Sequence, residues 1–152
     1  MLEVFKFFSK NISNILKETL EDKPVETLEE IRLRSNGSII LKFTGKQIVL
    51  PQKITYQDIL QSLQIMCDNS IYSYQNQIKQ GFITVRGGHR VGIAGSTVIE
   101  NGKVININYI SSINFRIAKQ IIGSGDKALQ YILKPEENSI YNTLIVSPPG
   151  AR

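Results

Sequence analysis

The sequence contains no tryptophan, one cysteine and one histidine, and these scarcities exclude several kinds of site. With Cys67 alone the chain forms no internal disulfide, and Cys67 with His89 supplies too few ligands for a four-ligand zinc site. Cys67 ends the apolar run Ile65-Met66-Cys67, which predicts a buried thiol rather than a reactive one. A protein of a reducing cytoplasm fits this pattern.

Long apolar runs are also missing, and none approaches the roughly 20 residues that a membrane-spanning helix needs. Residues 1–8 include Glu3 among their apolar side chains, unlike a signal peptide. The net charge of +5 invites a nucleic-acid interpretation, but the eight basic residues of positions 1–50 are scattered among seven acidic ones. A small basic nucleic-acid-binding α+β domain is therefore the alternative and not the preferred function.

The 152 residues, 41% apolar and 20% charged, suit one ordinary domain or one domain with a fragment. Helical spacing over residues 3–20 predicts an amphipathic helix, packed on its own domain or docked on a partner or membrane surface. Strands at 31–34, 39–43 and 47–50, joined by an Asn36-Gly37 turn and ended by Pro51, predict a small antiparallel hairpin sheet.

A capping box of Thr55 and Asp58 begins a helix predicted over 56–68, and a shorter helix covers Ser73–Gln80 before Gly81. Strands at 82–85, 89–99, 103–109 and 111–118, with turns at Gly87-Gly88 and Asn101-Gly102, then predict an antiparallel β-meander. This order of helix, hairpin sheet, central helices and meander is typical of an α+β fold.

The character of the sequence changes after Ala118, where Gly123-Ser124-Gly125 suggests a hinge before a short helix near residues 128–133. We therefore expect an N-terminal α+β domain in residues 1–118. Residues 119–152 would be the linker, helix and first strand of a second, truncated domain.

The segment Tyr141–Arg152 has the pattern of a buried strand followed by a Pro/Gly-rich turn, which is how a P-loop nucleotide-binding domain begins. Ser147 occupies the first glycine position of the P-loop pattern, and Arg152 occupies the second. The variable positions between them are Pro148, Pro149, Gly150 and Ala151. By pattern alone this is also an ordinary turn. Because the phosphate-binding lysine would follow residue 152, we expect no complete ATP site, no cofactor and no catalysis from this chain alone.

Four stretches resemble the bacterial stage III sporulation protein AA family, ATPases of the mother-cell-to-forespore channel apparatus and relatives of the secretion ATPases. They are Glu30–Arg34, Gln80–Gly95, Ile110–Ala118 and Tyr141–Gly150. The resemblance covers residues 26–150, and the block G-F-I-T-x-x-G-G-H-R-V-G that begins at Gly81 is its most specific part.

The resemblance implies that the loop continues as S-P-P-G-x-G-K-T into a RecA-like α/β core, with ATP and Mg²⁺ bound by the full-length parent. Arg152 departs from the family's glycine. The chain would then be an assembly or regulatory domain, cytoplasmic and peripheral to the mother-cell side of the forespore membrane. Its implied partners are channel membrane proteins and neighbouring protomers, with a homo-oligomer formed only by the full-length protein.

The resemblance also implies that Arg90 or Arg116 contacts nucleotide phosphates in the parent, a role that the fixed charge and forked donors of arginine suit. The alternative is that these arginines, like Arg86, Arg32 and Arg34, face solvent and pair with acidic residues. His89 has no carboxylate or cysteine partner nearby in sequence, so a hydrogen-bonded strand-end histidine is favoured over a catalytic base.

Two further groups of residues have a structural interpretation. Gly87, Gly88, Gly92 and Gly95 indicate positive φ or close backbone approach, with a β-bulge as the expected cause. Tyr72, Tyr74 and Tyr109 are assigned to the edges of the core and of an interface rather than to base stacking.

Overall fold

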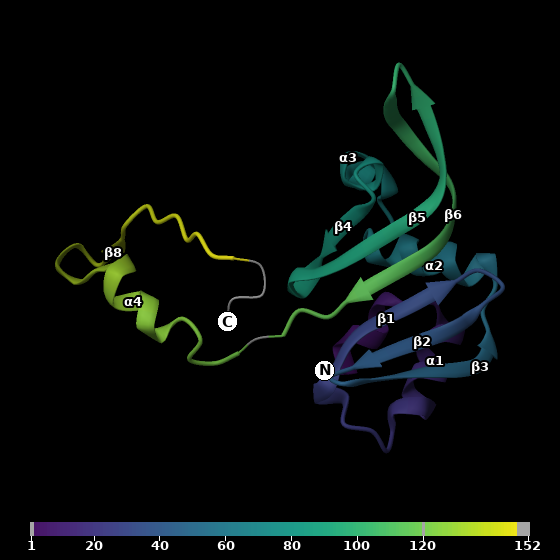
Figure 1. Ribbon diagram of the computed structural model, residues 1–152, viewed down its shortest axis with the longest axis horizontal. Coiled ribbons are helices and arrows are strands. Elements are labelled where there is room, and N and C mark those ends of the chain that lie inside the picture. The colour runs from purple at the N-terminus through teal and green to yellow at the C-terminus, as the bar shows by residue number, and fades with distance from the viewer. Residues whose placement is uncertain (1, 120, 149–152) are drawn as a thin grey trace. The chain divides into compact units, whose positions relative to one another are not determined.

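The computed structural model describes residues 2–119 and 121–148, and the chain divides into two units, Met1–Ala118 and Lys119–Arg152. The first unit contains one six-stranded antiparallel sheet with the strand order β3-β2-β1-β6-β5-β4 (Figure 1). Its strands are β1 Leu28–Arg34, β2 Ser38–Phe43, β3 Lys46–Lys53, β4 Phe82–Val85, β5 His89–Glu100 and β6 Lys103–Arg116. Its helices are α1 Lys10–Leu20, α2 Tyr56–Met66 and α3 Gln75–Lys79, with 3₁₀ turns η1 Leu2–Phe7, η2 Val25–Thr27, η3 Ile71–Tyr74 and η4 Arg86–Gly88.

The α+β class is confirmed, but the prediction of a separate hairpin sheet and meander is wrong, because β1 pairs with β6 and joins them. The register runs from Glu30 opposite Arg116 to Arg34 opposite Ser112. Short-range turn signals define the hairpins on either side of this junction, whereas the junction joins segments about eighty residues apart and leaves no local signal.

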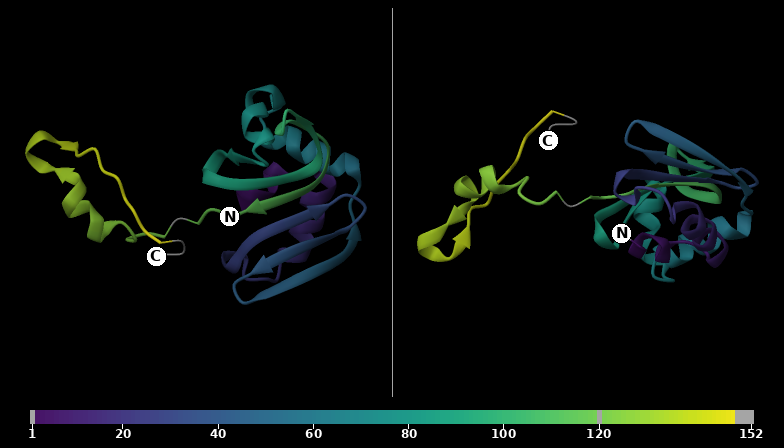
Figure 2. Two further views of the ribbon diagram at one scale, coloured as in Figure 1. Left: turned by 45° about the horizontal axis from the view of Figure 1, so that its top comes forward. Right: turned by 90° about the horizontal axis from the view of Figure 1, so that it is seen from below.

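The helices α1 and α2 lie on the same side of the sheet (Figure 2). Ile12 and Leu16 of α1 and Ile59 and Leu63 of α2 are buried in one apolar cluster with the strand residues that point to that side, such as Ile31. Because side chains alternate along a strand, the residues between them point to the opposite face. No helix of residues 2–118 covers that open face.

The predicted helix over residues 3–20 is interrupted at Ser9, so η1 and α1 are separate elements. The Ser9 hydroxyl accepts a hydrogen bond from the Ile12 N–H, which makes Ser9 the N-cap of α1. Ser9 also bonds to α2: its N–H donates to Ser62 Oγ at 2.9 Å and its hydroxyl donates to Asp58 at 3.0 Å. This contact fixes the start of α1 on α2, and the helix packs on its own domain.

The capping box of α2 is confirmed. The Asp58 N–H donates to Thr55 Oγ1, and the Asp58 carboxylate accepts from the Thr55 N–H at 2.9 Å. Asp58 is only 7% exposed and also accepts from the Asn11 amide at 3.1 Å. One buried carboxylate therefore satisfies donors from both helix N-termini.

Several strand boundaries differ from the prediction, and two of the differences have a clear physical reason. Pro51 does not end β3, which continues to Lys53. Since β3 is an edge strand and its register with β2 shifts between Ser38 and Ile40, the missing proline N–H is tolerated. The last two predicted strands of the meander are one strand, β6, in which Tyr109 has a φ of 40° at a bulge that shifts the apolar period.

Gly95 stands opposite this bulge, and its missing side chain makes the bulge possible. A Cβ at Gly95 would lie 2.7 Å from the carbonyl oxygens of Asn108 and Tyr109. Gly87 and Gly88 have positive φ, as expected, whereas a Cβ at Gly92 would meet only an ordinary contact at 3.6 Å. Positive φ or close approach therefore holds for Gly87, Gly88 and Gly95 and not for Gly92, and the expected β-bulge is the cause only at Gly95, because Gly87 and Gly88 lie in the turn η4.

The second unit contains α4 Asp126–Ile132, β7 Leu133–Lys134, η5 Pro135–Glu137 and β8 Ser139–Ile140, with β7 and β8 paired as a small hairpin. The short helix is confirmed. The predicted buried strand from Tyr141 is not formed in the described residues, where 141–148 have no strand pairing and Leu144 and Val146 are 86% and 84% exposed. A strand needs a neighbouring strand to pair its backbone groups, and no described residue supplies one here. The assignment of this unit to a P-loop domain stays a prediction.

Asp58→Asn is expected to lower the free energy of unfolding by about 2 kcal/mol at pH 7, because the amide turns a donor toward Thr55 and Ser9. Burial alone raises the pKa of Asp58, but hydrogen bonds from Thr55, Ser9 and Asn11 outweigh it and hold the pKa below its ordinary 3.8. The stabilisation is therefore complete above 3.8 and is lost as pH falls through the folded-state value. Urea unfolding should show the difference between the two proteins shrinking below pH 3.8; a constant difference would contradict this account.

Gly95→Ala is expected to cost about 2–3 kcal/mol, because the new methyl group overlaps two backbone carbonyl oxygens that can separate only by disrupting the bulge. Gly92→Ala, on the same strand without such overlap, is the matched control and should cost less than about 1 kcal/mol. Thermal unfolding of both variants measures the contrast. Equal losses would show that the bulge does not depend on Gly95.

Candidate functional site

Arginines collect on the open face of the sheet, in three rows that cross β1, β6 and β5. Glu30, Arg116 and Arg90 form the first row, as direct cross-strand partners. The second row contains Arg32, Asn114 and Gly92, and the third contains Arg34, Ser112 and Ala94. We call the surface formed by Glu30, Arg32, Arg34, Arg90, Ser112, Asn114 and Arg116 the arginine face.

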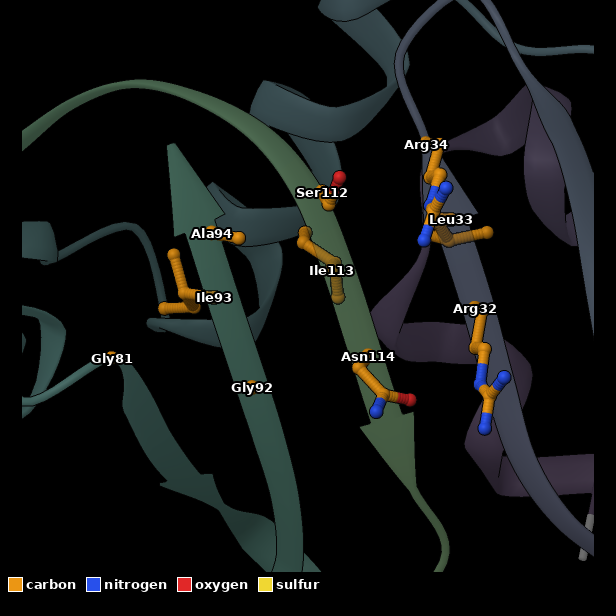
Figure 3. A pocket seen from close by; sticks show the side chains of 10 residues that line it. All are labelled: Arg32, Leu33, Arg34, Gly81, Gly92, Ile93, Ala94, Ser112, Ile113 and Asn114. Atoms are coloured by element: carbon orange, nitrogen blue, oxygen red, sulfur yellow. The ribbon is translucent and has the colours of Figure 1, made fainter. Parts of the chain in front are cut away.

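A cavity of about 530 Å³ opens on the second and third rows. Figure 3 shows its lining, with Arg32 and Arg34 from β1 beside Asn114 and Ser112 from β6. On β5 the two lining residues of the open face are small, since Gly92 has no side chain and Ala94 only a methyl group, and these leave room beside the polar groups. A hollow edged by guanidinium groups is suited to oxyanions.

Arg90 and Arg116 lie directly opposite each other, and both are exposed. The Arg90 guanidinium carbon lies 4.0 Å from the centroid of the Phe82 ring, a cation–π contact that fixes where its charge lies. Within the described residues neither arginine has a carboxylate within 4.0 Å. The structure thus brings the two predicted phosphate-contacting residues together, with their charges unneutralised by direct ion pairs.

Arg32 and Arg86 behave differently, because each has an acidic partner. Arg86 lies off the face and pairs with Asp68 at 3.4 Å, both side chains being well exposed. Arg32 donates from Nε to the Glu30 carboxylate. The alternative interpretation, solvent-facing arginines paired with acidic residues, therefore applies to Arg86 and in part to Arg32.

Glu30 is the buried carboxylate of this face, with 6% of its surface exposed. Burial raises the pKa of the Glu30 carboxyl. Hydrogen bonds from Arg32 and Asn114 and the nearby charges of Arg32 and Arg116 outweigh burial, so the pKa lies below its ordinary 4.5. Glu30 therefore stays ionised among the arginines at neutral pH.

His89 and Cys67 have structural environments. The Ala118 N–H donates to His89 Nδ1 at 3.0 Å, and the imidazole packs against Phe7 and Phe115 with centroid distances of 5.7 and 5.2 Å. Cys67 is buried, and burial together with the charge of Asp68 raises the pKa of its thiol to about 11. The buried-thiol prediction is confirmed, and an ionised, nucleophilic Cys67 is not favoured at neutral pH.

The structure describes only the first two residues of the partial P-loop. Ser147 and Pro148 end the exposed extended segment, and Pro149, Gly150 and Ala151 lie outside the described residues. Across residues 2–119 and 121–148, no three His, Cys, Asp or Glu side chains gather as metal ligands would. In the same part of the chain, no helix combines the length and apolar character that crossing a bilayer requires.

Sequence reasoning missed Glu30, Ser112 and Asn114. Glu30, Arg32 and Arg34 alternate with apolar residues, which places all three on one face of β1. This alternation was a sequence signal for Glu30. Alternation also places Ser112 and Asn114 on one face of β6 with Arg116, but only the β1–β6 register brings them beside Arg32 and Arg34.

The tyrosines have mixed outcomes. Tyr74 packs against the core, while Tyr72 is 84% exposed. Tyr109 stacks on Tyr56 at the start of α2, with ring centroids 4.4 Å apart. The prediction of a core edge thus holds for Tyr74 and not for Tyr72.

The fold and the arginine face define an α+β module with one helix-covered and one basic sheet face. The model of the family described as "Sporulation stage III, protein AA" matches residues 2–152, and the chain belongs to this family. It is 36% identical over 149 residues to stage III sporulation protein AA of Bacillus subtilis (strain 168), covering 98% of this chain and 47% of that protein. The chain thus spans about half the length of this curated relative.

A solved structure with partial similarity is the VirB11 ATPase from the Brucella suis type IV secretion system, crystallised in complex with sulphate. It is 13% identical, with a TM-score of 0.37, over 80% of this chain and 37% of that one.

Because His89 is the single histidine of the sequence, the effect of its titration on stability can be measured without interference from other histidines. Burial, and then the charge of Lys6, lower the pKa of His89 below its ordinary 6.5, so the unfolded chain binds the proton more tightly. Stability should be complete above pH 6.5 and should decline as pH falls toward the folded-state value. In the proton NMR spectrum the imidazole should titrate below 6.5, and His89→Asn should reduce the fall in melting temperature between pH 7 and 5. A titration midpoint above 6.5 would contradict the assigned environment.

Proposed function

We propose that this chain is the N-terminal assembly or regulatory domain of a sporulation ATPase of the secretion type. In this proposal the arginine face lies against bound nucleotide in the full-length oligomer, where Arg90 and Arg116 contact its phosphates. Membership of the sporulation stage III protein AA family and the S-P-P-G sequence at Ser147–Gly150 support this placement.

The observation on which the proposal rests is the cross-strand pair of Arg90 and Arg116. Like charges directly opposite each other destabilise a sheet. Attractive cross-strand pairs contribute roughly 0.2–1 kcal/mol, and we take the repulsion to be of similar size. A phosphate between two guanidinium groups reverses that repulsion, because each fork donates charge-assisted hydrogen bonds to its oxygens. This arrangement suits a ligand with clustered negative oxygens.

In this proposal the P-loop of the full-length protein holds the nucleotide, and the arginine face only contacts its phosphates. In the full-length protein, residues 119–152 would lead into a RecA-like domain, with Ser147–Ala151 at the start of its P-loop. ATP and Mg²⁺ belong to the full-length protein, and the 152 residues alone are not expected to hydrolyse ATP. Neighbouring protomers and channel membrane proteins are the proposed partners, at the cytoplasmic, mother-cell side of the forespore membrane.

One observation favours a second candidate, binding of a nucleic-acid backbone. Basic residues that are scattered in the sequence collect on one face of the sheet, in the arrangement expected of an electrostatic footprint. The face lacks exposed aromatic rings for base stacking, since Phe82 is half-buried beneath Arg90. Binding of DNA or RNA probes at low salt that weakens steeply with added salt would favour this candidate.

Arg90→Ala and Arg116→Ala in the full-length protein are each expected to lower kcat/KM for ATP hydrolysis at least about tenfold, because each removes charge-assisted donors to phosphate. Arg86→Ala is the matched control, since Arg86 is an exposed arginine of the turn η4 between β4 and β5 that pairs with Asp68 off the face. Steady-state phosphate release measures all three. Unchanged hydrolysis in both Arg90→Ala and Arg116→Ala would refute the phosphate-contacting role.

A further inference from the structure

The arginine face contains one carboxylate, and its environment is unusual for a surface ion pair. Glu30 is 6% exposed and bonds to Arg32 Nε, whereas the side chain of Arg32 is 42% exposed. Exposed ion pairs contribute little because both side chains stay mobile. A buried carboxylate is held in one place, so the groups that bond to it are held as well.

Glu30 has one basic neighbour across the β1–β6 pair and another along β1. Arg116 is its direct cross-strand partner, and Arg32 is two residues further along β1. Asn114, opposite Arg32, lies close enough to Glu30 to help lower the pKa of its carboxyl group. One negative group therefore lies among Arg32, Asn114 and Arg116, and it holds Arg32 by a direct hydrogen bond.

Arg32 keeps most of its donors free in this arrangement. A guanidinium has five N–H groups, and the bond from Nε to Glu30 uses the single N–H of Nε. The four N–H groups of the two terminal nitrogens remain available toward the cavity that Arg32 lines with Asn114 (Figure 3). The Asn114 amide oxygen is buried and has no hydrogen-bond partner in the described structure.

We propose that Glu30 is a positioning residue of the arginine face, which holds Arg32 so that its guanidinium group acts with that of Arg116 on the same phosphate-bearing ligand. This inference rests on the proposed function and extends it from Arg90 and Arg116 to the second row of the face. A ligand with clustered phosphate oxygens matches the donors that this region presents.

A purely structural carboxylate would give a different pattern from a positioning one. Asp58 provides the comparison within the same chain, because it is buried to 7% exposure, is hydrogen-bonded at both carboxylate oxygens and lies on the helix side of the sheet. Loss of either carboxylate should reduce stability. Only loss of Glu30 should change how the full-length protein binds nucleotide.

The experiment compares Glu30→Gln, Glu30→Asp and Asp58→Asn in the full-length protein, with melting temperature, kcat and the KM for MgATP measured for each. Glu30→Gln is expected to raise KM about tenfold, the effect of losing one oriented charge-assisted contact. Glu30→Asp, which keeps the charge, should recover part of that loss. Asp58→Asn should lower the melting temperature and leave KM within about twofold of wild type.

Arg32→Lys gives a second test that does not depend on replacing a buried group. Lysine keeps the charge but has no Nε fork, so it cannot bond to Glu30 and present further donors in the same plane. It should also raise KM, and wild-type KM in this folded variant would count against the inference.

The remaining outcomes separate this inference from the function on which it rests. If Arg116→Ala raises KM and Glu30→Gln changes only the melting temperature, Glu30 is structural and the positioning role is refuted. A lower KM in Glu30→Gln would also refute it, since Glu30 would then compete with the ligand for the arginines. Wild-type kinetics in Glu30→Gln, Arg90→Ala and Arg116→Ala together would refute the proposed function itself.

Discussion

The pairing of β1 with β6 is the constraint on which the rest of the first unit depends. It joins two antiparallel groups of strands, residues 28–53 and 82–116, through the register from Glu30 opposite Arg116 to Arg34 opposite Ser112. Because strand side chains alternate between faces, a shift of one residue would turn the arginines of β1 into the core and its leucines and isoleucine outward. The apolar face therefore enforces the register that assembles the arginine face.

The two faces of the sheet have opposite chemistry, and each uses one buried carboxylate. On the helix side, Asp58 receives hydrogen bonds from Thr55, Ser9 and Asn11 and fixes α1 on α2. On the open side, Glu30 lies among guanidinium groups. Both carboxylates are held ionised by their surroundings, but one is surrounded by neutral donors and the other by cations. The first arrangement completes a fold, whereas the second leaves an excess of positive charge at the surface.

The proposed function depends on this excess of positive charge on the open face. Charges that are close together on a rigid sheet act jointly on an anion, while the same charges scattered along a flexible chain would not. The bulge at Tyr109 and the close approach at Gly95 bend the long β5–β6 pair without disturbing the rows at residues 90–94 and 112–116. The arginine face therefore lies on the regular part of the sheet, where its geometry is best defined.

The sequence by itself determined the local elements: the capping box at Thr55 and Asp58, the Asn-Gly turns, the α2 helix and the α+β class. These depend on residues within a few positions of one another, so periodicity and turn chemistry are sufficient. Only the tertiary structure decided that the strands form one sheet, that Pro51 is tolerated on an edge, and that Asn114 and Ser112 join Arg32 and Arg34. Those outcomes depend on backbone pairing between segments about eighty residues apart, for which no local pattern exists.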